Sequence, residues 1–142
     1  MADTSYDVIE VVAMQLIGSD ATVIPVSAEM CFRTSDPYTV RAVFTGAHTM
    51  STWLLGRELL AQGVHAVADA PAGTGDVQVW RDDDPDYTLV SLSGVEGSAL
   101  LAAPTEPLLR FLAATESLVP IGAESDKMEG EITALIAALL TA

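Results

Sequence analysis

Alternating apolar and polar side chains between residues 22 and 33 constrain the fold of this chain more than any other feature. Ile24, Val26 and Met30 lie on one face of this segment, while Glu29 and Arg33 lie on the other. Because successive side chains of a β-strand point to opposite faces, this period of two predicts a strand with one face against a core.

Another strand is predicted just before it, over residues 6–17, and this one is apolar on both faces. Ile9 and Val11 share one face, and Val12 and Met14 share the other. A strand that is apolar on both sides is expected to be covered on both sides. The polar residues 18–20 predict the turn that follows.

The rest of the first half predicts two more strands and a short helix. The strands cover residues 40–45 and 49–54, after a turn at residues 35–37 in which Pro follows Asp. The helix covers residues 56–61. Gly63 is expected to end it in the left-handed conformation that glycine adopts without strain.

The second half follows the same plan of strands and then a helix. Residues 76–81 and 87–92 predict a hairpin around an acidic loop, and residues 97–103 predict another strand. Residues 64–68 suggest one more strand, and residues 108–118 predict a helix with Leu108, Phe111, Leu112 and Thr115 on one face. We therefore expect an α+β fold with two strand-rich halves of about four antiparallel strands, each half followed by a helix.

A separate C-terminal amphipathic helix is predicted over residues 125–141. Asp126 and Glu129 have the spacing of a capping box at its start. Its apolar stripe either packs on the sheet of the same chain or makes a contact between molecules, because a terminal helix after a linker can dock elsewhere. The stripe consists of Met128, Ile132, Leu135, Ile136, Leu139 and Leu140.

The net charge of the chain argues against nucleic acid as a partner. Six Lys and Arg residues face twenty Asp and Glu residues, for a net charge of -14. Proteins bind a phosphate backbone by neutralising it with Lys and Arg, and here the six cations are spread singly along the chain. Half of the residues are apolar, which is ample for a core and suggests a further buried surface such as an oligomer interface.

The single cysteine, Cys31, cannot form an intrachain disulfide and suits a reducing compartment. The N-terminal residues have no basic region before the apolar run, unlike a secretory signal. No apolar stretch approaches the roughly 18 residues of a membrane-spanning helix. We expect a cytoplasmic protein without membrane insertion.

The residue types that carry catalysis are mostly missing, so we expect no enzyme, no catalytic residues, no cofactor and no metal site. His48 and His65 have no neighbouring Cys or His at metal-ligand spacing and are interpreted as solvated loop residues. Cys31 has no local His and is interpreted as a structural thiol. The segment 73–75 lacks the helix and Lys that would make it a phosphate-binding loop.

The acidic segment at residues 82–86 resembles part of a calcium-binding loop. Asp82, Asp84 and Asp86 match its first three ligand positions, but Tyr87 replaces the glycine that turns the loop and Ser93 replaces the bidentate Glu. We interpret the segment as a solvated hairpin tip. Weak cation binding and contact with a basic patch of a partner are the alternatives.

Three residues that flank the acidic tip are candidates for contacts with a partner protein: Trp80, Arg81 and Tyr87. Aromatic residues and arginines often anchor protein interfaces. The alternative interpretation places Trp80 in the core.

With these residues laid out, the chain resembles the SsgA-like family of actinobacterial sporulation and cell-division regulators. The similarity runs from about Thr22 to the C-terminus, and the order and spacing of several short segments carry it. These segments are residues 36–44, Trp53 with residues 57–65, and residues 75–80, 92–94, 96–101, 103–104, 111–112, 115–116 and 119–122.

The resemblance implies a single SsgA-like domain over residues 1–142, with halves at 1–63 and 64–119 and the C-terminal helix at 125–141. It implies a fold similar to the Whirly single-stranded-DNA-binding proteins and assembly as a trimer. It also implies a non-catalytic role in septation, recruiting or positioning the tubulin-like GTPase FtsZ, with FtsZ or another SsgA-like protein as partner. A single-stranded nucleic-acid binder is the alternative that the implied fold leaves open, although fold alone does not carry function.

Overall fold

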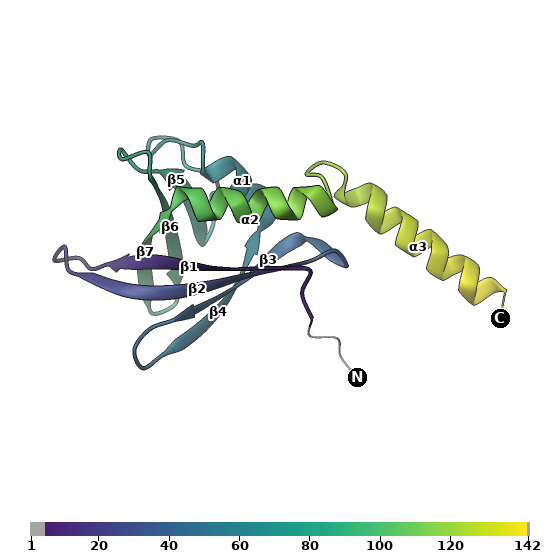
Figure 1. The fold of residues 1–142 in the computed structure, drawn as a ribbon, viewed down its shortest axis with the longest axis horizontal. Coiled ribbons are helices and arrows are strands. Elements are labelled where there is room, and N and C mark those ends of the chain that lie inside the picture. Colours follow the sequence, from purple (N-terminus) through teal and green to yellow (C-terminus); the bar gives the residue numbers. More distant parts are fainter. Residues whose placement is uncertain (1–4, 142) are drawn as a thin grey trace.

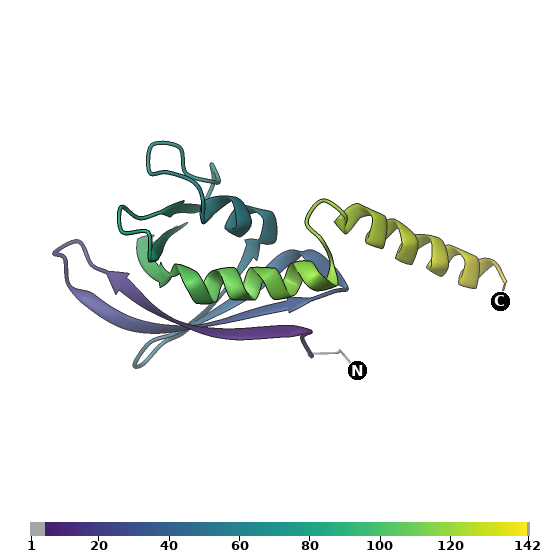
Figure 2. The ribbon, with the colours of Figure 1, turned by 45° about the horizontal axis from the view of Figure 1, so that its top comes forward.

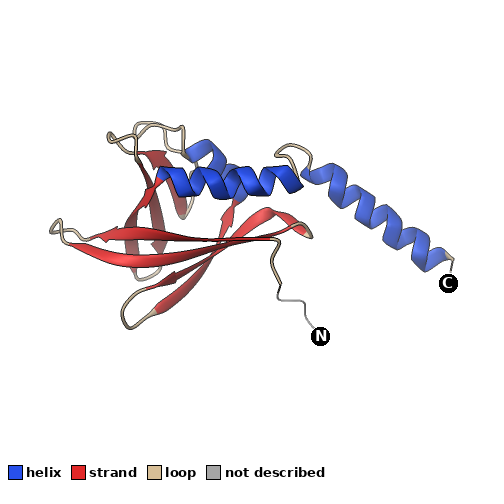
Figure 3. Ribbon diagram, in the orientation of Figure 1, coloured by secondary structure: helices blue, strands red, loops and turns tan. Residues whose placement is uncertain are grey.

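The computed structural model describes residues 5–141, with the side chains of residues 126–128 and 131 outside that description. Seven strands and three helices make up this part of the chain, as labelled in Figure 1 and coloured by type in Figure 3. In chain order they are β1 (Val8–Ile17), β2 (Val23–Arg33), β3 (Asp36–Thr45), β4 (Met50–Gly56), α1 (Arg57–Gly63), β5 (Val77–Arg81), β6 (Tyr87–Gly94), β7 (Gly97–Pro104), α2 (Thr105–Leu118) and α3 (Glu124–Leu140).

All seven strands belong to one antiparallel sheet in the order β4-β3-β2-β1-β7-β6-β5. β1 joins the two halves, because it pairs along its whole length with β2 but only through its last residues, Gln15 to Ile17, with β7. The α+β class and the antiparallel strands are confirmed. The expected four strands per half are corrected to four and three, since residues 64–68 form turns with one isolated bridge, Val67 to Ala70.

The curled sheet carries α1 and α2 against its concave face, which Figures 1 and 2 show from two directions. The alternation in β2 is confirmed, because Ala28, Met30 and Phe32 are buried in the core beneath the helices. On α2, the predicted face is confirmed as buried through Leu108, Phe111, Leu112 and Thr115, and the helix begins three residues earlier than predicted, at Thr105.

The other face of β1 is exposed, so the prediction that this strand is covered on both sides is wrong within this chain. Val12 and Met14 are buried, whereas the side chains of Ile9 and Val11 are 54% and 61% exposed. No helix of the described chain contacts the convex face at this point, because α2 packs on β1 from the concave side.

Two local predictions in the first half are also corrected. Gly63 is the last residue of α1 and does not have a positive φ. It is glycine because a Cβ there would lie 2.2 Å from Val79 Cγ1, so β5 packs directly on the helix backbone. The turn expected at residues 35–37 occupies residues 34 and 35, and Asp36 already pairs with Arg33 across the hairpin.

α3 extends away from the sheet, as Figure 1 shows, and packing of its apolar stripe on the same chain is therefore wrong. The described stripe residues are between 51% and 79% exposed: Ile132, Leu135, Ile136, Leu139 and Leu140. The capping box is also corrected, because Ala123 is at the N-cap and Asp126 lies inside the helix. The side chain of Met128 lies outside the described residues.

No helix between residues 5 and 141 is both long enough and apolar enough to cross a membrane.

Candidate protein-binding surfaces

The β5–β6 hairpin presents the three predicted anchors at its turn end, where they flank residues 82–86. Trp80 pairs with Leu89 and lies on the opposite strand face from the fully buried Val79. Trp80 and Tyr87 are half-buried, and Arg81 is exposed. Trp80 is therefore not part of the buried core, and all three side chains are partly accessible to a partner.

The acidic tip between the two strands is a tight, mostly exposed turn. The Asp86 N–H donates to Asp84 Oδ1 at 3.0 Å, and the Tyr87 N–H donates to the Asp84 carbonyl at 3.1 Å. Asp84 thus stabilises the turn, because its carboxylate and its carbonyl both accept hydrogen bonds from the turn backbone. Among the side chains that the structure describes, no group of three or more His, Cys, Asp or Glu is arranged to hold a metal ion.

A wide groove of about 950 Å³ lies where the β1–β2, β3–β4 and β6–β7 ends of the sheet meet. Its lining comes from strands and loops alone and is mainly apolar, including Leu16, Ile24, Phe44, Trp53 and Leu101. Its size and lining are typical of sites that take an apolar side chain or ligand. Sequence reasoning missed this groove, because its residues come from three separate strand ends.

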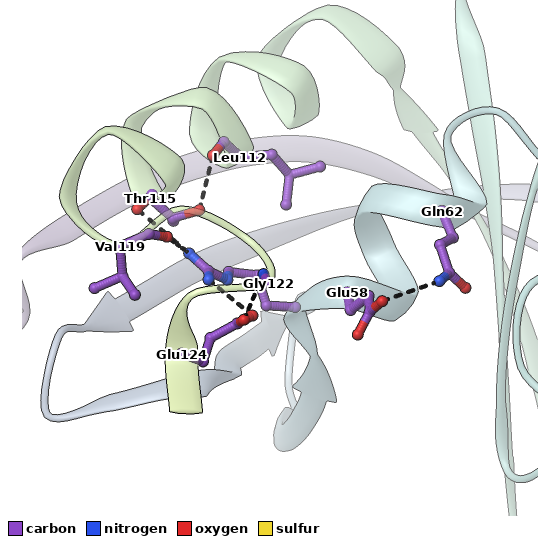
Figure 4. A network of polar contacts seen from close by, with 8 residues as sticks. Glu58, Gln62, Leu112, Thr115, Val119, Gly122 and Glu124 are labelled. Atoms are coloured by element: carbon purple, nitrogen blue, oxygen red, sulfur yellow. Dashed lines mark hydrogen bonds and ion pairs between the residues drawn. The ribbon is translucent and has the colours of Figure 1, made fainter. Parts of the chain in front are cut away.

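α3 leaves the domain at a buried ion pair that sequence reasoning also missed. Arg57, the first residue of α1, is fully buried, and its Nη2 donates to Glu124 Oε2 at 2.9 Å. Its Nη1 donates to the carbonyls of Val119 at 2.6 Å and Thr115 at 3.3 Å. Figure 4 shows these contacts converging on the end of α2 and the start of α3.

The surroundings of this ion pair favour the ionised form of Glu124. Burial by itself would raise the pKa of Glu124, but hydrogen bonds from Arg57 and from the backbone N–H groups of Glu124 and Gly122 lower it. The Arg57 guanidinium also lies over the ring of Phe32, 5.0 Å from its centroid, while its Nε has no hydrogen-bond partner among the described residues. One side chain thus joins α1, α2 and the first turn of α3.

No local signal marks Arg57 or Glu124 in the sequence. Arg57 falls within a segment that resembles the SsgA-like family, but its burial follows from the packing of α1 between β5 and α2. Glu124 lies one residue before the predicted helix start. Their separation of 67 positions explains why periodicity could not pair them.

The two histidines and the single cysteine are the other residues that sequence reasoning considered for chemistry. His48 and His65 are exposed in loops. Cys31 is a free, buried thiol. Burial raises the pKa of Cys31 to about 11, and the hydrogen bond to Glu29 and the charge of that carboxylate contribute in the same direction. Cys31 is thus a buried, un-ionised thiol, and its interpretation as a structural residue stays a prediction.

Comparison with known proteins places this fold among sporulation and cell-division proteins. Residues 26–124 match the family described as "Streptomyces sporulation and cell division protein, SsgA". This match covers most of the chain, including the acidic hairpin and the Arg57–Glu124 pair. The chain belongs to the SsgA family.

Within that family, the relatives found include proteins named "Sporulation-specific cell division protein SsgB". The Streptomyces coelicolor protein is 42% identical over 78% of this chain and 80% of its own length. The Kineococcus radiotolerans protein is 37% identical over 92% of this chain and 78% of its own length. The similarity to SsgB proteins thus extends over most of both chains.

Two solved structures share the fold. The SsgA-like sporulation-specific cell division protein from Thermobifida fusca superimposes with a TM-score of 0.78 at 35% identity, over 97% of this chain and 98% of that one. The second structure superimposes with a TM-score of 0.74. It comes from a study of SsgB mutations that correlate with longitudinal cell division during sporulation of Streptomyces coelicolor. It is 36% identical and covers 88% of this chain and 99% of that chain. The curled sheet with three helices is therefore the fold of this family.

Proposed function

We propose that this protein is a non-catalytic regulator of septation that recruits or positions the FtsZ division machinery, in sporulation where the organism sporulates. The observation that carries the proposal is similarity over most of the chain to sporulation-specific cell division proteins named SsgB. A protein with this role acts by presenting surfaces rather than by chemistry. We place it in the cytoplasm, with recruitment to the division septum.

Self-association is the first part of the proposal. The last nine residues of α3, residues 132–140, carry no Lys, Arg, Asp or Glu, although the chain as a whole has a net charge of -14. Two copies repel each other at long range, so they meet most favourably through uncharged apolar surface. The exposed α3 stripe supplies such a surface, which supports a homo-oligomer, and we propose a trimer.

Contact with the division protein is the second part. Trp80, Arg81 and Tyr87 combine two half-buried aromatic rings with an exposed guanidinium beside an acidic tip. Interfaces concentrate their binding energy in a few such aromatic and arginine residues surrounded by polar groups. We assign these three residues as the anchors for FtsZ or for another SsgA-like protein.

Binding of purified FtsZ tests this function. We expect immobilised wild-type protein to retain FtsZ, and Trp80→Ala and Arg81→Ala each to weaken retention by about tenfold, as truncated anchors typically do. Arg110→Ala, which also removes one exposed arginine but lies on α2, is the matched control and is expected to bind as the wild type does. Equal binding by all variants would reject the anchors while leaving recruitment in place.

Depletion in growing cells tests the role itself. We expect loss of the protein to displace septa and a fluorescent fusion to localise to them. If wild-type protein retains no FtsZ, and depletion leaves septum placement unchanged, recruitment of FtsZ is rejected.

A nucleic-acid-binding role would give a different result. Arg57 and Arg110 pair with carboxylates, and the six Lys and Arg residues of the chain face twenty Asp and Glu residues, which disfavours a phosphate backbone as partner. Binding to single-stranded DNA that weakens steeply as salt rises would favour that role over recruitment.

A further inference from the structure

A pocket of about 220 Å³ opens on the convex face of the sheet, away from the helices and the hairpin anchors. Strand register builds it: Cys31, Arg41 and Leu54 are cross-strand neighbours on β2, β3 and β4. Tyr6, just before β1, covers one side of this row. The pocket therefore draws residues from four separate segments.

Two arginines meet at Tyr6. The Arg33 guanidinium lies 4.3 Å from the centre of the Tyr6 ring, and that of Arg41 lies 5.9 Å from it. Two guanidinium groups thus lie beside this pocket, together with the Asp36 carboxyl that lines it.

Arg41 has hydrogen-bonding capacity to spare. It is half-buried, and its one hydrogen bond within residues 5–141 runs from Nη1 to the Tyr6 hydroxyl at 3.2 Å. No described carboxylate oxygen lies within 4.0 Å of its nitrogen atoms, although Asp36 lines the same pocket. A guanidinium carries five N–H donors in a planar fork that matches a carboxylate. The other donors of Arg41 are therefore available to an incoming oxyanion.

The pocket favours one small anionic group over an extended polyanion. Its volume suits a carboxylate on a short chain and lies below the roughly 300 Å³ at which typical small-molecule pockets begin. The Cys31 thiol that lines it is buried and un-ionised, so it adds no negative charge. Exposed Leu54, and Ile9 one strand beyond Cys31, flank it with apolar surface. An acidic side chain between apolar residues matches this arrangement.

We propose that the Arg41 pocket binds a single carboxylate of a partner protein, an Asp or Glu side chain flanked by apolar residues. The site lies on a different face from the proposed anchors at Trp80, Arg81 and Tyr87, and does not depend on them. The guanidinium of Arg41 would hold the carboxylate, and the flanking residues of the partner would contact Leu54 and Ile9.

Peptide titration followed by NMR tests this proposal. The probes are acetyl-Leu-Glu-Leu-amide, its neutral counterpart acetyl-Leu-Gln-Leu-amide, and inorganic phosphate, each followed through the Arg41 Nε–H and Tyr6 ring signals. We expect saturable millimolar binding of the Glu peptide and at least tenfold weaker binding of the Gln peptide.

Variants assign the binding to Arg41. Arg41→Gln is expected to weaken binding of the Glu peptide at least tenfold, and Arg110→Gln, the same substitution at an exposed arginine on α2, to change it less than twofold. Arg41→Lys keeps a positive charge at this position, so the fold is expected to be retained. It loses the planar fork of N–H donors, and we expect it to bind the Glu peptide severalfold more weakly than the wild type does. Equal binding of both peptides, unchanged binding by both Arg41 variants, or tighter binding of phosphate than of the Glu peptide would overturn the proposal.

Discussion

Arg57 Nη2 and Glu124 Oε2 lie 2.9 Å apart in the interior, joining the first residue of α1 to the first residue of α3. The same guanidinium binds the carbonyls at the end of α2. The position where the exposed C-terminal helix leaves the domain is therefore set by one buried charged side chain. Changes to either partner affect both stability and the placement of α3.

Glu124→Ala is expected to lower the free energy of unfolding by about 3–5 kcal/mol, because it leaves the buried Arg57 charge without a counter-ion. Urea denaturation measures the loss. The matched control is Glu10→Ala, which breaks the exposed pair with Arg110 and is expected to cost about 1 kcal/mol or less. Equal losses for the two substitutions would contradict the role given to the buried pair.

Acid is expected to weaken the same contact. The folded-state pKa of Glu124 lies below that of an unfolded glutamate, so its contribution to stability is complete above about pH 4.3 and is lost as the pH falls through the folded value. The stability advantage of the wild type over Glu124→Gln should therefore shrink as the pH falls from about 5 toward 3. Thermal unfolding across this range checks it, and an advantage that grows on acidification would refute it.

Cys31 is expected to react slowly with thiol reagents. With a pKa of about 11 it is almost entirely un-ionised at pH 8, and it is buried against the sheet. Labelling by Ellman's reagent should be at least about tenfold slower than for free cysteine in native buffer. In denaturant the two rates should converge, and rapid labelling of the native protein would contradict this assignment.

Replacing Asp82, Asp83, Asp84 and Asp86 together with Asn is expected to leave the fold intact and the melting temperature unchanged or slightly raised. The tip is mostly exposed, and its like charges repel one another. Asn at position 84 keeps a side-chain oxygen for the Asp86 N–H. A wild-type melting temperature that rises several degrees with millimolar calcium, but not in the variant, would instead reveal a metal site.

The α3 stripe is expected to hold an oligomer together. Sedimentation equilibrium at micromolar concentration should show association of the wild type. Leu135→Ser with Leu139→Ser should shift the protein toward the monomer with little loss of stability, because both side chains are exposed in the single chain. Val67→Ser, at an exposed apolar position in a loop outside the groove, is the control. A wild type that remains monomeric would reject self-association.

The sequence by itself determined the features that depend on neighbouring residues. The period of two in β2 and the buried face of α2 follow from strand and helix geometry, so their burial could be predicted position by position. The exposure of the acidic tip and of both histidines followed from the polar or turn-forming residues around them. In each case the spacing of side chains along one element carries the information.

Only the tertiary structure decided which distant residues meet and which apolar faces remain open. Arg57 and Glu124 pair because α1 and α2 pack on the same concave face, and Gly63 is needed because Val79 presses on it. Arg41 lies beside Cys31 and Leu54 through strand register, which depends on how three strands align. Ile9 and the α3 stripe look like core in the sequence, because apolar periodicity reports that a face can be buried without identifying what covers it.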